Sequence, residues 1–356
     1  MRLSFLAALA SVALGVVPGG GFAGLAATPV AAAAPDQANF RAFLDGLRGR
    51  AMAAGITRAT LDAVIPTLSY NPRVVALDRA QPGGNPAAGA APAIAPFAPY
   101  RIRHVDADRI RRGRARYRDL RPRLAAIEAK TGVPESITMA IYGHETGYGT
   151  FTGDFDLLRS LASLAYEGRR RELFTGEWIA TMLLLQRGIP RTQLKGSWAG
   201  ATGYPQFLPS MYLRLAVDGD GDGRIDIWRS EPDALASIGN YLLNAGWKPH
   251  VPWGVAVRVP AGFDRAAIAS RLKSPRCPRV IERHSRWLTI AEWRRLGIVM
   301  VGSPVPAETE MASLIEPDGP NATAYLLTTN YRTILDYNCS NFYGLSVGLL
   351  ADAIAQ

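Results

Sequence analysis

The sequence contains little cysteine or histidine, and this scarcity excludes several kinds of functional site. Among its 356 residues are two cysteines and four histidines, and they show no zinc-finger spacing. We expect no catalytic-triad motif of the G-x-S-x-G kind among the serines and the four histidines. No RNA-binding signature and no internal repeat is visible. We therefore expect neither a zinc finger nor a serine hydrolase, and no nucleic-acid partner.

Long apolar runs are also scarce, and the one that stands out lies at the start of the sequence. Residues Leu3–Val17 are nearly all apolar, follow the basic residue Arg2 and precede an alanine-rich zone that ends at Ala34. This order is typical of a secretory signal peptide, and the run is short for a membrane span. We predict a cleaved signal peptide over residues 1–34, with an uncleaved anchor as the alternative. No cysteine stands near the cleavage zone to carry a lipid.

Acidic residues are fewer than basic ones, with 30 Asp and Glu against 40 Lys and Arg. The predicted signal peptide holds one charged residue, Arg2, so its removal lowers the net charge from +10 to +9. Much of this charge lies in the arginine-rich run 101–123. A basic exported protein suits an anionic partner, such as a cell-wall polymer or a membrane surface.

The two cysteines, Cys277 and Cys339, would meet an oxidising compartment in an exported protein. Because the count is even, we predict a disulfide that ties the β-containing region to the final helical segment. Two distant cysteines that stay buried and reduced are the alternative, since spacing alone does not set the geometry of a disulfide.

Hydrophobic spacing predicts a mainly α (α+β) protein. About 320 mature residues exceed a typical single core, so we expect one large lobed domain or two domains. The predicted regions are an N-terminal helical region with a Pro/Gly/Ala-rich linker, a helical core, a small β-containing lobe, and a C-terminal helical segment that packs on the core. These regions are residues 35–130 with linker 81–99, then 131–250, 251–329 and 330–356.

Two patterns illustrate this division. Tyr117 and Leu124 belong to an apolar series at helical spacing, which predicts one charged amphipathic helix over residues 105–130. Val255 and Val257 alternate with other residues, as the residues of a strand do.

The most informative segment is 131–149, which reads TGVPESITMAIYGHETGYG. Pro134 favours a helix start, and three glycines crowd the other end. On this helix Glu145 lies about 80° from Ile137 and about 40° from Ile141, at the rim of the apolar face. The helix dipole and partial burial would both raise its pKa, as a general acid requires. An ordinary surface glutamate is the alternative.

A second carboxylate, which most glycosidases use, is not evident. Asp154 and Asp156 are near Glu145 in sequence, but nothing marks either as a nucleophile. His144 would point about 100° away from Glu145 on a helix, so we expect it to be structural rather than a base.

An acidic segment, DGDGDGRID at residues 218–226, matches an EF-hand loop at its first, third, fifth, sixth and ninth positions. Carboxylates this close repel one another unless a cation lies among them. The twelfth position is Arg229 rather than the usual glutamate, and Glu231 or Asp233 could supply the missing carboxylate. We predict a structural calcium site over 218–233, with a solvated acidic turn as the alternative. The assigned residues are Asp218, Asp220, Asp222, Arg224, Asp226 and Asp233.

Taken together, these segments resemble the B-type lytic murein transglycosylases, exported enzymes that cleave the glycan strands of peptidoglycan. The matching stretches are spread from about residue 131 to 352, in one order. They are GVPESITMAIYGHETGYG, RRRELF, LKGSWAGATGYPQFLPS, DGDGDGRIDIW, SIGNYLLNAGW and DYNCSNFYGLSVGLLA. The resemblance implies a lysozyme-like helical core over 131–250, with an added N-terminal helical lobe and a small β lobe.

The resemblance also implies roles for particular residues. The glutamate of the Glu-Thr pair, Glu145, would be the single acidic catalyst. A set of polar and aromatic residues would line the saccharide groove, and two arginines would lie near the stem peptide. The groove residues are Ser197, Gln206, Tyr241, Tyr337, Asn338 and Tyr343, and the arginines are Arg169 and Arg170.

The implied reaction is non-hydrolytic. Glu145 would protonate the bond between N-acetylmuramic acid and N-acetylglucosamine, then take the proton of the muramoyl C6 hydroxyl to close a 1,6-anhydro ring. No cofactor is needed for this chemistry. We expect a periplasmic monomer whose partner is peptidoglycan. A hydrolytic muramidase and a non-catalytic peptidoglycan-binding module are the alternatives.

Overall fold

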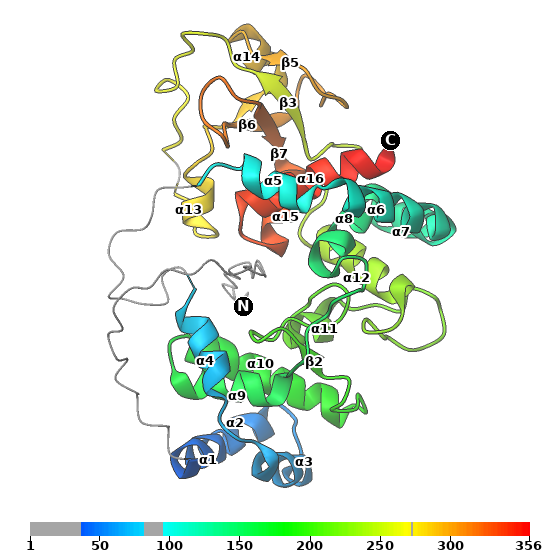
Figure 1. The fold of residues 1–356 in the computed structure, drawn as a ribbon, viewed down its shortest axis with the longest axis vertical. Helices are drawn as coiled ribbons and strands as arrows, with labels where there is room; N and C mark the ends of the chain where they lie inside the picture. The colour runs from blue at the N-terminus through cyan, green and yellow to red at the C-terminus, as the bar shows by residue number, and fades with distance from the viewer. Residues whose placement is uncertain (1–36, 82–94, 272) are drawn as a thin grey trace, which may run out of the picture.

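The computed structural model describes residues 37–81, 95–271 and 273–356, and Figure 1 traces them from blue to red. The predicted signal peptide, 1–34, and most of the predicted linker, 82–94, lie outside these residues. Among the helices of the described part, none combines the length and the apolar character that crossing a bilayer requires.

The first helices build one lobe together with two helices from the middle of the chain (Figure 1). Buried Phe40 and Leu44 belong to the same hydrophobic cluster as Leu161 and Trp178. This cluster therefore joins segments on both sides of residue 130, where sequence spacing predicted a boundary. The helices of this lobe are α1 (Gln37–Gly46), α2 (Arg48–Ala53), α3 (Arg58–Val64), the 3₁₀ turn η1 (Ile65–Thr67), α4 (Pro72–Arg79), α9 (Leu157–Glu167) and α10 (Arg171–Gln186).

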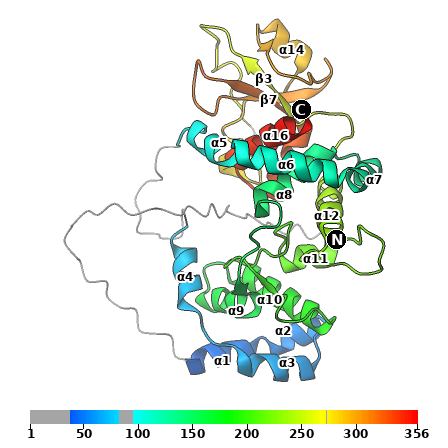
Figure 2. The same ribbon diagram turned by 45° about the vertical axis from the view of Figure 1, so that its right-hand side comes forward.

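A second cluster forms the centre of the molecule, around α8 (Glu135–Thr146) and α16 (Asn341–Ala355). Both helices bury apolar residues on most sides. Ile141 of α8 and Leu345 of α16, for example, have no exposed surface. Figure 2 shows α5 and α6 crossing this layer between the lower helices and the sheet. The other helices of the layer are α5 (Ala98–His104), α6 (Ala107–Asp119), α7 (Arg121–Thr131), α12 (Glu231–Asn244) and α15 (Thr329–Tyr337).

The predicted single helix over 105–130 is wrong, because the structure has two helices there. α6 ends at Asp119 and α7 begins at Arg121, with Leu120 between them outside ideal helical geometry. Pro122 lies in the first turn of α7, where its missing N–H needs no partner, whereas inside a continuous helix it would break a hydrogen bond. Gly132, in the left-handed region, then ends α7 before α8 begins.

A small antiparallel sheet caps the upper end of the molecule (Figure 1). Val255 pairs with Leu326, which also pairs with Leu314, so the central strands are apolar and buried. Trp293 of α14 (Ile290–Arg295) fills the cluster under the sheet. The predicted mainly α (α+β) class is therefore confirmed. In spatial order the strands are β4 (Leu288–Thr289), β6 (Met311–Ile315), β7 (Ala324–Thr328), β3 (Gly254–Arg258) and β5 (Val299–Met300).

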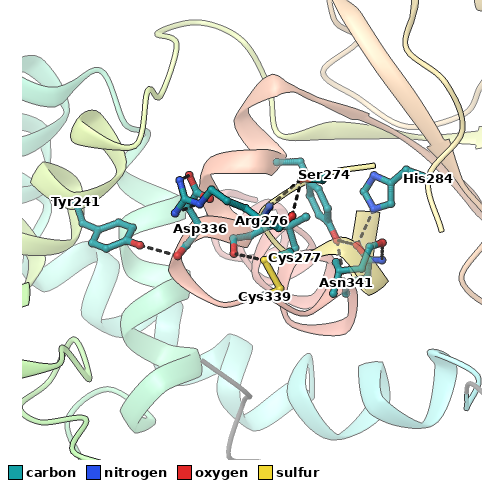
Figure 3. The surroundings of a disulfide bond; sticks show 11 residues. Tyr241, Ser274, Arg276, Cys277, His284, Asp336, Cys339 and Asn341 are labelled. Carbon is teal, nitrogen blue, oxygen red and sulfur yellow. Dashed lines mark hydrogen bonds and ion pairs between the residues drawn. A yellow bond between two sulfur atoms is a disulfide. The ribbon is translucent and has the colours of Figure 1, made fainter. Parts of the chain in front are cut away.

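A disulfide joins the small lobe to the helical centre (Figure 3). Cys277 precedes α13 (Pro278–Ile281), Cys339 follows α15, and their Cα atoms lie 5.7 Å apart. Beside it, Arg276 pairs with Asp336, whose carbonyl accepts a hydrogen bond from the Tyr241 hydroxyl at 2.6 Å. The bridge therefore anchors the turn between α15 and α16, which carries Asn338.

Candidate active site

Glu145 lies in the last turn of α8, and three features of the sequence place it there. Pro134 is the N-cap residue, apolar residues bury the helix, and Gly147 adopts φ 58° to end it. The Tyr343 hydroxyl of α16 donates to Glu145 Oε1 at 2.7 Å. Within the described residues Oε2 has no hydrogen-bond partner, so it can carry a proton toward a ligand.

The surroundings of Glu145 favour its neutral form. Burial raises the pKa of Glu145 to about 7, and the hydrogen bond from Tyr343 opposes part of that rise. No other carboxyl group of the described residues contributes to this shift. Because the residue keeps some exposed surface, a substrate can reach it. A carboxyl group that is largely protonated at or below neutral pH and accessible can act as a general acid.

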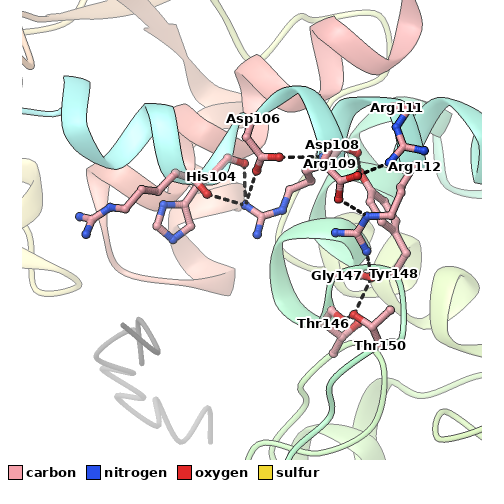
Figure 4. Close-up of polar contacts among 11 residues, drawn as sticks. His104, Asp106, Asp108, Arg109, Arg111, Arg112, Thr146, Gly147, Tyr148 and Thr150 are labelled. Atoms are coloured by element: carbon pink, nitrogen blue, oxygen red, sulfur yellow. Dashed lines mark hydrogen bonds and ion pairs between the residues drawn. The ribbon is translucent and has the colours of Figure 1, made fainter. Parts of the chain in front are cut away.

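The end of α8 is held from outside by α6, as Figure 4 shows. Arg112 donates to the Gly147 carbonyl at 3.0 Å, and the Tyr148 hydroxyl donates to the Arg109 carbonyl at 2.9 Å. Arg112 thus satisfies a carbonyl that the helix end would leave without a partner. These bonds fix the turn that carries Glu145.

The three tyrosines predicted for the groove lie close together. The rings of Tyr241 and Tyr337 meet edge to face at 4.7 Å, and the Tyr337 hydroxyl donates to the Pro205 carbonyl. Burial raises the pKa of Tyr337 well above its usual value, and the nearby charge of Glu145 adds to this. Tyr343, Tyr337 and Tyr241 therefore form an aromatic group beside the carboxyl. Asn338 follows Tyr337 directly and is partly exposed.

The loop that carries Ser197 and Gln206 packs against the segment that follows α8. Gln206 Nε2 donates to the carbonyls of Thr152 and Gly203, and Ser197 Oγ accepts from the Ala201 amide at 3.1 Å. At Gly153 a Cβ atom would lie 2.3 Å from the Gly196 carbonyl, so only glycine permits this approach. Near this loop β1 (Phe155–Asp156) pairs with β2 (Lys195–Gly196), and α11 (Pro209–Leu215) follows.

Arg169 and Arg170, which the family resemblance assigns to a stem peptide, both bind a buried aspartate of α4. Arg169 and Arg170 each place a guanidinium nitrogen 2.5 Å from Asp78 Oδ1. Burial alone would raise the pKa of Asp78, but the hydrogen bonds from the two arginines outweigh it and leave it lowered. In this structure the arginines hold α4 onto the start of α10, and a role toward a peptide stays a prediction.

A group of stacked rings beside Glu145 was not assigned to the site from the sequence. Tyr100 stacks on His104 with ring centroids 3.7 Å apart, and His104 stacks on His144 at 5.2 Å. Burial is the main cause that raises the pKa of Tyr100 to about 12, and the charge of nearby Glu145 adds to the rise. Tyr100 and His104 are spaced four residues apart on α5, but that spacing does not say which neighbour their rings meet.

The six residues predicted to bind a metal fall into two groups in the structure. Asp218, Asp220 and Asp222 can bring one carboxylate oxygen each within 4.8 Å of one another. Asp233 instead accepts the amides of Gly219 at 2.9 Å and Asp226 at 2.6 Å, and so closes the loop.

The remaining acidic-loop candidates point to other partners. Asp226 accepts the Trp228 amide and the Gln193 side chain, and the Arg224 amide donates to Asp222. Glu231 accepts from the Tyr142 hydroxyl at 2.7 Å and is not part of the cluster of three aspartates. The three clustered aspartates are hard oxygen ligands of the kind that suits calcium.

Solved structures of other proteins share this fold. SltB3 from Pseudomonas aeruginosa, solved with NAG-NAM-pentapeptide, matches with TM-score 0.77 and 38% identity, covering 89% of this chain and 79% of SltB3. Escherichia coli Slt35, solved with bulgecin A, matches with TM-score 0.69 and 27% identity over 90% of this chain and 93% of Slt35. A structure of Slt35 with calcium matches with TM-score 0.68 and 27% identity, over the same shares of both chains. These matches place this protein in the lysozyme-like lytic transglycosylase fold class, as predicted.

The chain belongs to the transglycosylase SLT domain family, which matches residues 39–352. It is 31% identical over 260 residues to membrane-bound lytic murein transglycosylase B of Escherichia coli K12. That alignment covers 72% of this chain and 66% of the relative, so it spans about two thirds of the relative's length. The predicted family, and at the family level the enzyme class, are confirmed.

Proposed function

We propose that this protein cleaves the MurNAc-GlcNAc β-1,4 bond of peptidoglycan without water and leaves 1,6-anhydroMurNAc ends. The observation that carries the proposal is the state of Glu145. It is a partly accessible carboxyl group whose pKa burial raises to about 7, and no other carboxyl group in the described part of the chain contributes to the shift. One group that is readily protonated and readily ionised near neutrality can act first as acid and then as base.

In the first step, protonated Glu145 gives its proton to the glycosidic oxygen as the bond to the muramoyl C1 breaks. The acetamido oxygen of the same sugar can stabilise the positive charge that develops at C1. In the second step, the Glu145 carboxylate takes the proton of the C6 hydroxyl, whose oxygen bonds to C1. The acid is regenerated, and no water is consumed.

The surroundings of Glu145 suit a sugar polymer. Faces of tyrosine rings pack on pyranose rings, and amide side chains match acetamido groups. Tyr241, Tyr337 and Tyr343 provide such rings, and Gln206 and Asn338 provide such amides. The presence of NAG-NAM-pentapeptide in the related SltB3 structure supports this assignment.

We further propose a periplasmic monomer, exported by a signal peptide over residues 1–34. The same proposal includes a structural calcium ion held by Asp218, Asp220 and Asp222, outside the chemistry. The cluster of their oxygens supports the ion, as does the calcium in the related Slt35 structure. An ion there would draw the loop together ahead of α12.

The test is a mass spectrum of the products formed from purified peptidoglycan by the mature protein and by Glu145→Gln. We expect anhydromuramoyl ends from the parent and uncut strands from the variant. Glu172→Gln, at an exposed glutamate of α10, is the matched control and should act like the parent.

The alternatives predict other products. A muramidase would give reducing muramic acid, heavier than the anhydro product by one water, and a binding module would leave strands uncut in the parent as well. Either result would overturn the proposal.

A further inference from the structure

We propose that His144 and Ser346 form a positioning pair that holds the Tyr343 hydroxyl against Glu145. The inference rests on the proposed function of Glu145 and concerns how that site is kept in order. Both residues act through Tyr343, and neither is proposed to touch the substrate.

Two hydrogen bonds connect the pair to Tyr343. His144 Nε2 lies 2.7 Å from Ser346 Oγ, and Ser346 Oγ donates to the Tyr343 carbonyl at 2.9 Å. Because a serine hydroxyl has a single hydrogen, Ser346 accepts from His144, whose Nε2 therefore carries the proton. The pair thus joins α8 to α16 at the residue next to Glu145 and at the residue that donates to it.

Ring contacts hold the His144 side chain in this position. Its imidazole meets the Tyr343 ring edge to face at 4.7 Å, and it stacks with His104 at 5.2 Å and with Tyr100 at 6.3 Å. The His104 carbonyl accepts from Arg109 at 2.8 Å, which ties this stack to α6 (Figure 4). A ring packed against three others has little freedom to rotate, so its hydrogen bond to Ser346 is kept.

A serine beside a histidine can also be a nucleophile and its base. The expectation that no G-x-S-x-G motif is present was wrong, because the segment 344–348, GLSVG, matches that pattern. The structure argues against that role. Ser346 has no exposed surface and lies inside α16, whereas the nucleophile of that motif sits on an exposed turn between a strand and a helix. Its hydroxyl hydrogen is also committed to a backbone carbonyl.

Glu145 is the group of this cluster that titrates near neutral pH. Burial lowers the pKa of His144 well below its usual value, helped by the nearby His104 and Arg109. Burial likewise lowers the pKa of His104. The remaining ionisable neighbours are tyrosines, whose pKa values burial raises, and arginines. They are Tyr100, Tyr337, Tyr343, Arg103 and Arg109.

The experiment follows the titration of Glu145 in the full mature chain, by NMR of isotope-labelled glutamate carboxyl carbons, with Glu145→Gln to assign the signal. Since the Tyr343 bond holds the pKa of Glu145 down, a looser bond raises it. His144→Phe keeps a ring without the donor, and Ser346→Ala removes the acceptor. Each should lower the acid dissociation constant of Glu145 by roughly three- to tenfold, the effect of one hydrogen bond.

Three further variants separate positioning from general stability. His144→Gln keeps a side-chain N–H donor. It should leave the acid dissociation constant of Glu145 within about twofold of its value in the parent, which is less than the effect of losing one hydrogen bond. In a Tyr343→Phe background, Ser346→Ala should cause no further change, because its effect passes through Tyr343. Ser163→Ala, at a buried serine of α9, should change melting temperature without moving the titration.

The proposal is overturned if His144→Phe and Ser346→Ala lower the melting temperature but leave the titration where it is in the parent. An equal shift from Ser346→Ala with and without the Tyr343 hydroxyl would also overturn it. The titration needs no turnover. A protein that failed to cut peptidoglycan would therefore refute the proposed function and still allow this test.

Discussion

The chain places carboxyl groups in two opposite environments. Glu145 is surrounded by aromatic rings and receives a hydrogen bond from Tyr343, and burial raises its pKa to about 7. Asp218 lies in an open loop, where the amides of Gly223 and Gly221 donate to its oxygens and lower its pKa. The same chemical group is thus prepared as an acid in one region and as a permanent anion in the other.

The difference shows what decides the role of a carboxylate. Backbone amides of a glycine-rich turn stabilise negative charge, and an anion cluster then attracts a cation. Rings offer no such compensation, so the carboxyl they surround keeps its proton to higher pH. The two regions differ in how deeply the carboxyl group is buried and in how many hydrogen-bond donors it meets, rather than in residue type.

The largest expected effect comes from removing the acid itself. Glu145→Gln should abolish cleavage nearly completely, because general acid and general base roles are each worth about 10² to 10⁴-fold. Asp218→Asn should leave the cleavage rate nearly unchanged, because that loop is proposed to stay outside the chemistry. Rates on purified peptidoglycan would check both, and an inactive Asp218→Asn that is fully folded would break the distinction between the two regions.

The next effect concerns the frame around Glu145. Replacing Cys277 and Cys339 by serine opens a loop with a sequence separation of 62. In the chain-entropy account, a loop of that size contributes on the order of 3–4 kcal/mol to the free energy of unfolding. Denaturant unfolding of the double variant against the parent would measure the change. Equal midpoints would show that the helical centre holds Tyr337 and Tyr343 without the bridge.

Calcium should act on one region alone. At a hundred times its dissociation constant, a bound ion would stabilise the fold by about 2.7 kcal/mol. We expect the melting temperature to rise in calcium over chelator for the parent and for Glu145→Gln, and to stay constant for Asp218→Asn. If the parent melts at the same temperature in both solutions, the acidic turn without an ion is the correct interpretation.

The smallest effect sharpens the electrostatics of Glu145. Since the protonated form is the acid, activity should fall as pH rises through its pKa of about 7. The Tyr343 bond lowers that pKa, so Tyr343→Phe should move the falling limb to higher pH, by about one unit for one hydrogen bond. A limb that moved to lower pH in Tyr343→Phe would show that another group controls it.

Several elements were predictable because their signals are local. Pro134 and the glycines after Thr146 mark the two ends of α8, and the alternation of Val255 and Val257 indicated β3. The break at Leu120 was missed because the apolar spacing continues across it, although Pro122 was the available signal. The predicted boundary at residue 130 differs from the observed packing because α1–α4 find their apolar partners in α9 and α10, far along the chain.

The candidate site was predictable only in part. The motif containing Glu145 pointed to the acid that we propose, since its short pattern is continuous in sequence. The pairing of Arg169 with Asp78, and the stack of His104 on His144, join residues that local spacing does not relate. His144 was expected to be structural, but its partner Ser346 could not be named from the sequence.

By itself the sequence determined the family and the mainly helical class, and it singled out the acidic group that we propose for the chemistry, because motifs and periodicity are properties of neighbouring residues. The state of that group was decided by the tertiary structure. Burial raises the pKa of Glu145, and among the described residues its one hydrogen-bond donor is Tyr343, which α16 brings to it across 198 positions of sequence. Burial and hydrogen-bond geometry arise only when distant segments pack together.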